Sequence, residues 1–519
     1  MSDLLIGIDL GTTSTKAAVF DQSGHQIAEA VLPTPLNWHG PDACDQDPQD
    51  FYAGTISAVR GCLDQKGVEP SRVVGLGVAG QMAGVMGVDA NFCPSMPYDS
   101  WLDLRCAADV SEIEATVGGA LISTTGCPPM VNHAPKMRWW KREQPGAYDN
   151  TAKFVMPGGY VAGRLAGLKA DDAFIDHTYL HFTGVADSEH SRWSDDLTRE
   201  IGIDKEKLPR IVEPTLAIGV LSAEASAATG LPQGVPIAAG LGDTAAGALG
   251  AGVVYPDQLL DVAGTAAVFA GSTNDFRPDV KNHTLLLMHG AIDGQWISLA
   301  YLSGGNLITW FQESVASHNA EPASEMDFDQ LTEAVETIQA GADGLLFLPF
   351  LDGRILPTNA SMRGAWIGLN RHHRHEHMLR AVLESVPYEY SLYLRIFREL
   401  HPRVRPSEIR AVGGGARSAV WNRIKASVLG LPYCRVEREE PGCWGAAMTA
   451  GKAVGLFEDL AQTATSTTAV AQQFDFDPAD HETYTAMTSL YGSAIEGLEA
   501  TFAQLAPRQT MKSEGEAFA

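Results

Sequence analysis

The N-terminal part of the chain consists of short apolar runs separated by polar turns. Runs at residues 4–9, 16–20 and 26–32 are joined by turns rich in Gly, Ser and Asp, which predicts a β-meander. Residues 48–66 place their apolar side chains at helical spacing, and residues 73–80 form a continuous apolar run with the length of a buried strand. Because strand, helix and strand alternate, the pattern predicts an α/β fold.

The opening pattern returns near the middle of the chain. Residues 235–252 read as a strand, a glycine turn and a small-residue helix that starts at Asp243. The next segment, "LLDVAGTAAVFAGS" at residues 259–272, has a strand with an acid, Asp261, then Gly-Thr and "AAVF", as the first hairpin has around Asp9. This echo indicates that a second domain begins near residue 250 with the same hairpin, so that the two turns face each other across a cleft.

Further apolar and amphipathic segments complete the second half. We expect strands at 344–350 and 409–415, helices at 374–399 and 416–430, and a frayed tail from residue 507. The predicted organisation is an N-terminal domain at 1–250, a C-terminal domain at 251–490, and a helix end with a flexible tail at 491–519.

Composition and charge restrict the classes of function. The chain has 519 residues, 45% of them hydrophobic, which fits two well-packed domains. Its formal net charge of −26 disfavours nucleic acid and anionic membranes as partners. Seven scattered cysteines favour a reducing compartment. No apolar stretch reaches the roughly 18 residues of a membrane span, and the start lacks signal-peptide features, so we expect a cytoplasmic protein.

The first turn, "IGIDLGTTSTKAAVFDQSG", carries candidate phosphate chemistry. It differs from a P-loop because GxxxxGK[ST] is missing and a second strand, rather than a helix, follows. A carboxylate at the mouth of a phosphate site requires a cation, so Asp9 is predicted to hold Mg²⁺ through water. A hairpin that merely favours Gly and Thr is the alternative. The residues predicted to face phosphate are Thr12, Thr13, Ser14, Thr15 and Lys16.

Two later segments carry further candidate chemistry. Asp243 precedes "TAAGALG", where an Asp serves either as a helix N-cap or as a general base that accepts a hydroxyl proton during phosphoryl transfer. The strand "AVGGGARSAVW" ends in glycines, which allow a ring or a phosphate to approach the backbone closely.

Together these motifs resemble the ATPase core of sugar kinases, actin and heat-shock chaperones. More specifically, the chain resembles the FGGY carbohydrate kinases over nearly its whole length. The most specific match is "GAWIGLNRHHRHEHMLRAVLE" at 364–384, and "KMRWWKRE" at 136–143 resembles a second signature. The resemblance implies two actin-like, ribonuclease H-like ATPase domains with an interdomain cleft.

The same resemblance implies ATP and Mg²⁺ as cofactors and assigns roles to individual residues. Asp243 becomes the catalytic base, close to the metal and the substrate, and Asp9 the metal-side acid. A second phosphate motif maps to Gly264 and Thr265. Nucleotide contacts map to Gly305 and Thr309, and the adenosine motif to Gly414 and Gly415.

Within the family, "GQM" and "WLDLR" resemble the xylulokinase pattern and place the sugar at Gln81, Met82, Trp101, Asp103 and Arg105. Xylulokinases usually continue with a histidine, where this chain has Ala83. The resemblance therefore implies phosphorylation of a small neutral sugar, with xylulose first. Ribulose, arabinitol, erythritol and glycerol are alternatives, and a non-catalytic actin-like or chaperone-like ATPase switch is the rival class. The oligomeric state, monomer or homodimer, stays open.

Overall fold

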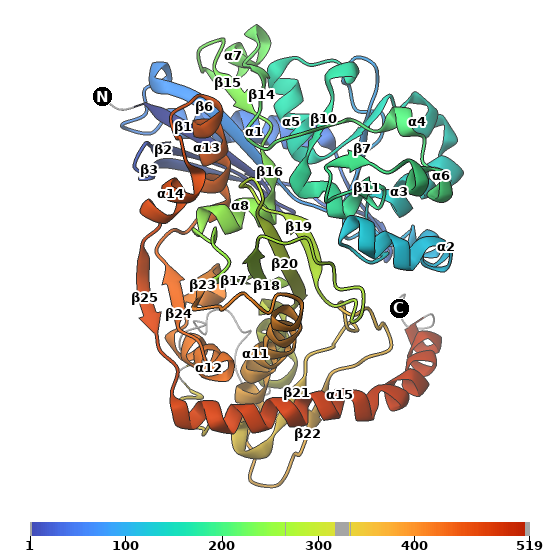
Figure 1. The fold of residues 1–519 in the computed structure, drawn as a ribbon, viewed down its shortest axis with the longest axis vertical. Helices are drawn as coiled ribbons and strands as arrows, with labels where there is room; N and C mark the ends of the chain where they lie inside the picture. The colour runs from blue at the N-terminus through green and yellow to red at the C-terminus, as the bar shows by residue number, and fades with distance from the viewer. Residues whose placement is uncertain (1–2, 265, 317–331, 333, 514–519) are drawn as a thin grey trace.

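The computed structural model describes residues 3–264, 266–316, 332 and 334–513, which form two mixed β-sheets with helices around them (Figure 1). The first sheet has the order β14-β15-β6-β1-β2-β3, with β16 paired to β6, and the second has the order β19-β20-β18-β17-β23-β24-β25. The strands of the first sheet are β1 (Leu4–Leu10), β2 (Ser14–Asp21), β3 (Gln26–Pro33), β6 (Val73–Gly80), β14 (Ala217–Val220), β15 (Pro236–Ala238) and β16 (Leu241–Gly242). Those of the second are β17 (Gln258–Ala263), β18 (Ala266–Thr273), β19 (Leu286–His289), β20 (Trp296–Ser303), β23 (Glu408–Val412), β24 (Tyr433–Val436) and β25 (Val470–Phe474).

Smaller sheets and helices surround these two. The short strands are β4 (Asn37–Gly40), β5 (Ala43–Gln46), β7 (Met86–Val88), β8 (Tyr98–Asp99), β9 (Lys153–Val155), β10 (Phe174–Asp176), β11 (Ala186–Asp187), β12 (Arg192–Trp193), β13 (Arg210–Val212), β21 (Leu346–Leu348) and β22 (Ala365–Ile367). The helices are α1 (Pro48–Leu63), α2 (Ala107–Thr125), α3 (His133–Glu143), α4 (Pro145–Asn150), α5 (Pro157–Ala166), α6 (Asp195–Ile201), α7 (Ala223–Thr229), α8 (Asp243–Gly250), α9 (Gly305–Phe311), α11 (His375–Leu400), α12 (Ala419–Leu429), α13 (Pro441–Ala453), α14 (Leu460–Ser466) and α15 (Pro478–Ser513).

The two large sheets repeat one arrangement of strands. In the first, β1 pairs antiparallel with β2 and parallel with β6, so that Asp9 lies opposite Lys16. In the second, β17 pairs antiparallel with β18 and parallel with β23. The sequence echo between the two hairpins is therefore an echo in structure, and the predicted meander, helix and strands of the N-terminal part are confirmed.

Several predicted elements differ in extent from the structure. The strand expected at 409–415 ends at Val412 in β23, and a 3-10 turn at Gly414–Arg417 precedes α12. The strand expected at 344–350 is only the short β21, which follows a 3-10 turn at Ala342–Gly344. The C-terminal helix α15 continues to Ser513 and so runs into the segment expected to be a frayed tail; residues 514–519 lie outside the described part. None of the described helices combines the length and the apolar composition needed to cross a bilayer.

Helix α13 belongs to the C-terminal part of the sequence but packs on the first sheet, beside α8 (Figure 1). Its backbone lies directly on β1 and β6: a Cβ atom at Gly7 would overlap the Cys443 carbonyl oxygen, and one at Gly77 would overlap that of Ala446. Because even a methyl group does not fit, this contact depends on glycine. The domain boundary at residue 250 stays a prediction. Helix α13 follows that boundary in the sequence but packs on the sheet that precedes it.

Replacing Gly77 by Ala tests this contact. We expect Gly77→Ala to lower the free energy of unfolding by about 1–3 kcal/mol, the usual cost of forcing an extra methyl group into a close-packed interior. The measurement is the midpoint of urea unfolding.

The control is Gly119→Ala on the exposed face of α2, where an added Cβ meets no atom within 4 Å. That substitution should be neutral or stabilising, because Ala favours helix over Gly. Equal effects of the two substitutions would contradict the close-packing argument.

Candidate active site

The ends of three parallel strands bring the predicted catalytic residues to one edge of the first sheet. β6 runs parallel to β1 and to β16, and the next residues along the chain are Gln81 after β6 and Asp243 after β16. Asp9 lies near the end of β1, where its neighbour on β6 is Ala79. Residues far apart in the sequence thus meet at the carboxyl edge, where ligands bind in open α/β sheets.

Asp9 and Asp243 share an electrostatic environment that disfavours ionisation. Burial raises the pKa of Asp9 to about 7, with a further contribution from the Asp243 charge, while Lys16 acts in the opposite direction. Burial likewise raises the pKa of Asp243 to about 6, against the hydrogen bonds from Thr244 that lower it. Two carboxylates held close together in a poorly solvated site favour a cation between or beside them.

The donor set fits a hard divalent cation. Asp9 Oδ1 is buried and makes no hydrogen bond within the part of the chain that the structure describes. No three His, Cys, Asp or Glu side chains gather as metal ligands among these residues. A site with one or two carboxylates, completed by water and phosphate oxygens, is typical of magnesium.

The local structure makes Asp243 available for chemistry rather than for capping. The N-cap of α8 is Gly242, and Asp243 is the first helical residue. Its Oδ1 accepts hydrogen bonds from Thr244 N–H at 2.6 Å and from the Thr244 hydroxyl at 3.1 Å. These bonds fix the orientation of the carboxylate through Oδ1, and Oδ2 takes no part in them.

The first turn is braced by residues that were predicted for the sugar end. Gln81 N–H donates to the Leu10 carbonyl at 2.9 Å, and Gln81 Nε2 donates to Gln46 Oε1 at 2.8 Å. Trp101 Nε1 donates to the Thr12 hydroxyl at 3.0 Å. Gln81 and Trp101 therefore hold the turn in place. The contribution of Gln46 has no sequence signal, because it comes from a strand that carries no motif.

The hydroxyls of the turn do not all point the same way. Thr15 is fully buried and its hydroxyl pairs with that of Thr34 at 3.0 Å, inside the domain. Thr13 is exposed, and Ser14 and Lys16 are half-buried. Because successive residues of a strand face opposite sides, β2 places Ser14 and Lys16 together and turns Thr15 away from them.

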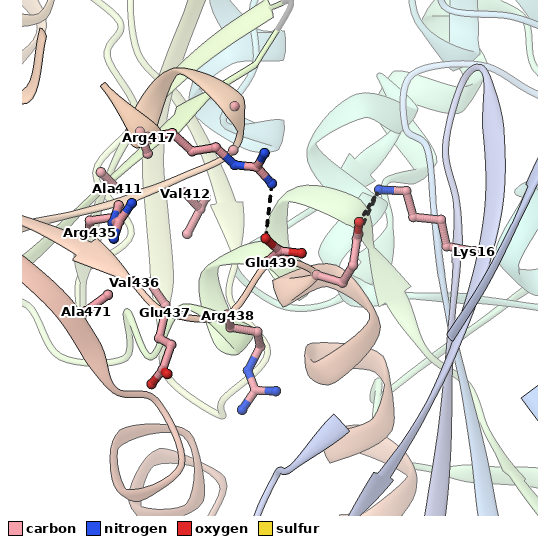
Figure 2. Close-up of a pocket in the computed structure, with 14 residues that line it drawn as sticks. Lys16, Ala411, Val412, Arg417, Arg435, Val436, Glu437, Arg438, Glu439 and Ala471 are labelled. Carbon is pink, nitrogen blue, oxygen red and sulfur yellow. Dashed lines mark hydrogen bonds and ion pairs between the residues drawn. The ribbon is translucent and has the colours of Figure 1, made fainter. Parts of the chain in front are cut away.

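A pocket of about 480 Å³ lies beside this turn (Figure 2). It is lined by Lys16 from the first sheet and by Gly413, Gly414 and residues 435–440 from the C-terminal part. Figure 2 shows Lys16 reaching from β2 toward this wall, where its Nζ meets both Glu440 oxygens at 2.7 Å. The predicted adenosine segment thus faces the predicted phosphate lysine.

The other nucleotide candidates lie at the glycine turns. Gly305 N–H donates to the Gly264 carbonyl at 2.9 Å, which joins the start of α9 to the end of β17. Thr309 is exposed one helical turn later. A Cβ on Gly414 would meet open space, whereas one on Gly415 would press on Trp421. Gly414 is therefore the open position, and Thr265 lies outside the described residues.

The predicted sugar end has one residue in contact with the catalytic turn and a charged pair behind it. A Cβ on Gly242 would lie 2.6 Å from the thioether of Met82, so Met82 packs against the residue that precedes Asp243. Buried Asp103 accepts from Arg105 Nε at 2.7 Å and from Cys44 N–H at 2.8 Å. The Arg105 guanidinium stacks 4.2 Å from the Trp139 ring centre. Asp103 and Arg105 therefore support the wall of the site.

Ala83, where the xylulokinase pattern breaks, has an unusual backbone. Its φ is +64°, in the left-handed region that most side chains avoid. The next residue, Gly84, approaches Tyr98 so closely that a Cβ there would overlap the phenol. The loop after Gln81 and Met82 is thus tightly turned, and sequence reasoning gave no sign of Tyr98.

Comparison with known proteins gives matches to two family models. A model of the N-terminal domain of the FGGY family of carbohydrate kinases matches residues 4–250, and one of the C-terminal domain matches residues 262–454. The chain belongs to the FGGY family of carbohydrate kinases. Its fold is accordingly the two-domain actin-like ATPase fold, and it is an ATP-dependent sugar kinase.

Individual relatives cover most of this FGGY kinase. A xylulose kinase of Bacillus subtilis (strain 168) is 30% identical over 465 residues, 89% of this chain and 90% of that protein. A gluconokinase of the same organism is 25% identical and covers 89% of each chain. The crystal structure of xylulose kinase from Rhodospirillum rubrum, 26% identical, superposes with a TM-score of 0.88 over 96% of this chain and 100% of that one.

Removing the charge of Asp243 tests its role as the base. Asp243→Asn should keep the fold and nucleotide binding but lower sugar phosphorylation about 10²–10⁴-fold, the usual contribution of a general base. The measurement is ADP release at saturating sugar, with the melting temperature and nucleotide affinity recorded in parallel.

Asp196→Asn provides the matched control, because Asp196 is also an acid in the first turn of a helix, α6, but its side chain is exposed. It should phosphorylate at the wild-type rate. A near wild-type rate for Asp243→Asn itself would exclude Asp243 as the base.

Proposed function

We propose that this kinase phosphorylates a small neutral ketose, most specifically the pentulose xylulose. The observation that carries the proposal is the Gln81–Met82 turn, which resembles the xylulokinase pattern and packs Met82 against Gly242, the residue before Asp243. The similarity to xylulose kinases supports it. In the proposed reaction the sugar hydroxyl oxygen attacks the terminal phosphate of ATP, and Asp243 accepts the proton of that hydroxyl.

The charges around the site favour a neutral sugar over a sugar acid. Of the residues predicted for the sugar end, Arg105 is the cation, and it is already paired with Asp103. Lys136, on α3 behind this wall, donates to Asp99 at 2.7 Å. An aldonate would add a negative charge next to Asp9 and Asp243, in a protein with a net charge of −26.

The phosphates would be held from both sides of the cleft. Lys16 and the backbone N–H groups of the first turn lie on one side, and the turns at Gly264, Gly305 and Gly414 on the other. Mg²⁺, held by Asp9 and Asp243 largely through water, would supply charge neutralisation at the transferring phosphate. We also place the enzyme in the cytoplasm, where ATP is supplied and where its cysteines, all free in the structure, stay reduced.

A panel of acceptors tests the function. ADP release would be measured with Mg²⁺-ATP and D-xylulose, L-xylulose, D-ribulose, arabinitol, erythritol, glycerol and gluconate. We expect the highest kcat/KM for a pentulose and only slow ATP hydrolysis without sugar, because an empty sugar site leaves Asp243 without a hydroxyl to deprotonate. ATP turnover that no acceptor accelerates would instead support the ATPase switch.

Ala83 is the residue that we expect to set the ranking of sugars. Ala83→His should change the order of kcat/KM across the panel, because one buried hydrogen-bond partner is worth about 1–3 kcal/mol in discrimination. Histidine is among the side chains that tolerate positive φ, so the turn can accept it.

Ala83→Gly is the control, since it suits the φ of +64° and adds no polar group. It should leave the order unchanged. A uniform loss for Ala83→His on every sugar, with a lower melting temperature, would mean overpacking behind the wall and not a change in specificity.

A further inference from the structure

The ion pair between Lys16 and Glu440 joins the two sides of the nucleotide pocket (Figure 2). Lys16 comes from β2 of the first sheet, while Glu440 ends the connection from β24 of the second sheet to α13. The contact is bidentate, with both carboxylate oxygens 2.7 Å from Nζ. The two side chains remain 30% and 22% exposed, so solvent and ligands reach the pair.

Two carboxylates, Glu440 and Asp9, act on the charge of Lys16. Burial works against the ammonium, but the hydrogen bond and charge of Glu440, followed by the charge of Asp9, raise the pKa of Lys16. Glu440 in turn contributes to the raised pKa of Asp9. Asp9 and Glu440 therefore both act on the charge of Lys16, in a pocket that is also lined by Arg417, Arg435 and Arg438. As long as Lys16 stays paired with Glu440, its charge is cancelled for an incoming phosphate.

Glu440 has no evident task in holding the helix that it precedes. It is the N-cap residue of α13, yet its side chain makes no capping hydrogen bond. The start of α13 lies against the site as well, since a Cβ on Gly442 would be 2.7 Å from Asp9 Oδ2. The carboxylate of Glu440 is thus directed at Lys16 and not at the helix.

We propose that Glu440 is a positioning residue that holds Lys16 at the mouth of the pocket and competes for it with the phosphates of the nucleotide. The inference rests on the proposed nucleotide role of this pocket. In the free enzyme the pair keeps the ammonium on the phosphate side of the cleft. When nucleotide binds, Lys16 exchanges the carboxylate for a phosphate oxygen, and part of the binding free energy is spent on breaking the pair.

The test is the affinity of each variant for a non-hydrolysable ATP analogue and for adenosine, by calorimetry without sugar. Glu440→Gln should tighten the analogue about fivefold, which equals about 1 kcal/mol and is the usual upper value for a partly exposed pair. Adenosine, which has no phosphate, should bind as before. In the Lys16→Met background the effect of Glu440→Gln should disappear, since the two residues act as a unit.

Glu437→Gln is the charge-matched control. Glu437 lines the same pocket on the same segment, and Figure 2 shows its side chain pointing away from Lys16. Its effect should be smaller, and it should persist without Lys16. The proposal would be overturned if Glu437→Gln raised the affinity for the ATP analogue equally, or if Glu440→Gln still raised it in the Lys16→Met background. Either result would mean that only the overall negative charge of the pocket matters.

Two further outcomes decide the remaining cases. Weaker analogue binding in Glu440→Gln would mean that Glu440 keeps hold of Lys16 in the complex, which contradicts competition. If Glu440→Gln lowers the melting temperature, Glu440→Asn is used in its place, because it removes the same charge and Asn is a preferred N-cap residue. The affinities of that variant for the ATP analogue and for adenosine then test the proposal. A wild-type enzyme that binds neither ATP analogue nor ADP would refute the nucleotide role itself, whereas normal wild-type binding with unchanged variants refutes only the inference.

Discussion

The contact of α13 with the first sheet is the constraint on which the site depends. Glycines at positions 7 and 77 let the helix backbone lie directly on β1 and β6, and Gly445 repeats this closeness toward α8. The strand that leads into α13 belongs to the second sheet. The segment between β24 and α13 therefore passes from the second sheet to the first. It brings Glu440 to Lys16 and the start of α13 to Asp9. The packing of α13 on the first sheet thus determines which side chains meet at the pocket.

That packing concentrates negative charge where the family requires phosphate to bind. Burial raises the pKa values of Asp9 and Asp243, and the buried Oδ1 of Asp9 makes no hydrogen bond within the described chain. Unpaired buried carboxylates are costly, so they persist in folded proteins mainly where function needs them. Lys16 already relieves part of this cost, and on the proposed function a divalent cation that binds with the nucleotide would relieve more of it, which would link the affinity for nucleotide to the metal.

The sequence was sufficient for the local elements and for the motif residues, and insufficient for their partners. Short-range patterns predicted β1, β2, β3, α1 and α8, because hydrophobic periodicity and turn chemistry are local. The pairing of Lys16 with Glu440, the brace of Gln46 on Gln81, and the splitting of Thr15 from Lys16 depend on residues brought together by the fold. A motif does not reveal which distant residues pack against it or which side of the strand each of its side chains faces. These features therefore became visible only in the structure.

The two hairpins show how one pattern serves two purposes. Asp9 lies one strand pair before the end of its hairpin and Asp261 lies two pairs before the end of the other, so the two acids point to opposite sides of their strands. Asp261 is fully buried and accepts hydrogen bonds from Tyr390 at 2.7 Å and Tyr433 at 2.8 Å, beside the Lys425 ammonium. Satisfied in this way, Asp261 is part of the core of its domain. Within the described residues Asp9 Oδ1 has no hydrogen-bond partner, and Lys16, whose charge lowers the pKa of Asp9, is paired with Glu440. The repeat is therefore asymmetric because a one-residue difference in spacing turns one acid into the core and leaves the other, Asp9, at the edge where we propose that metal and phosphate bind.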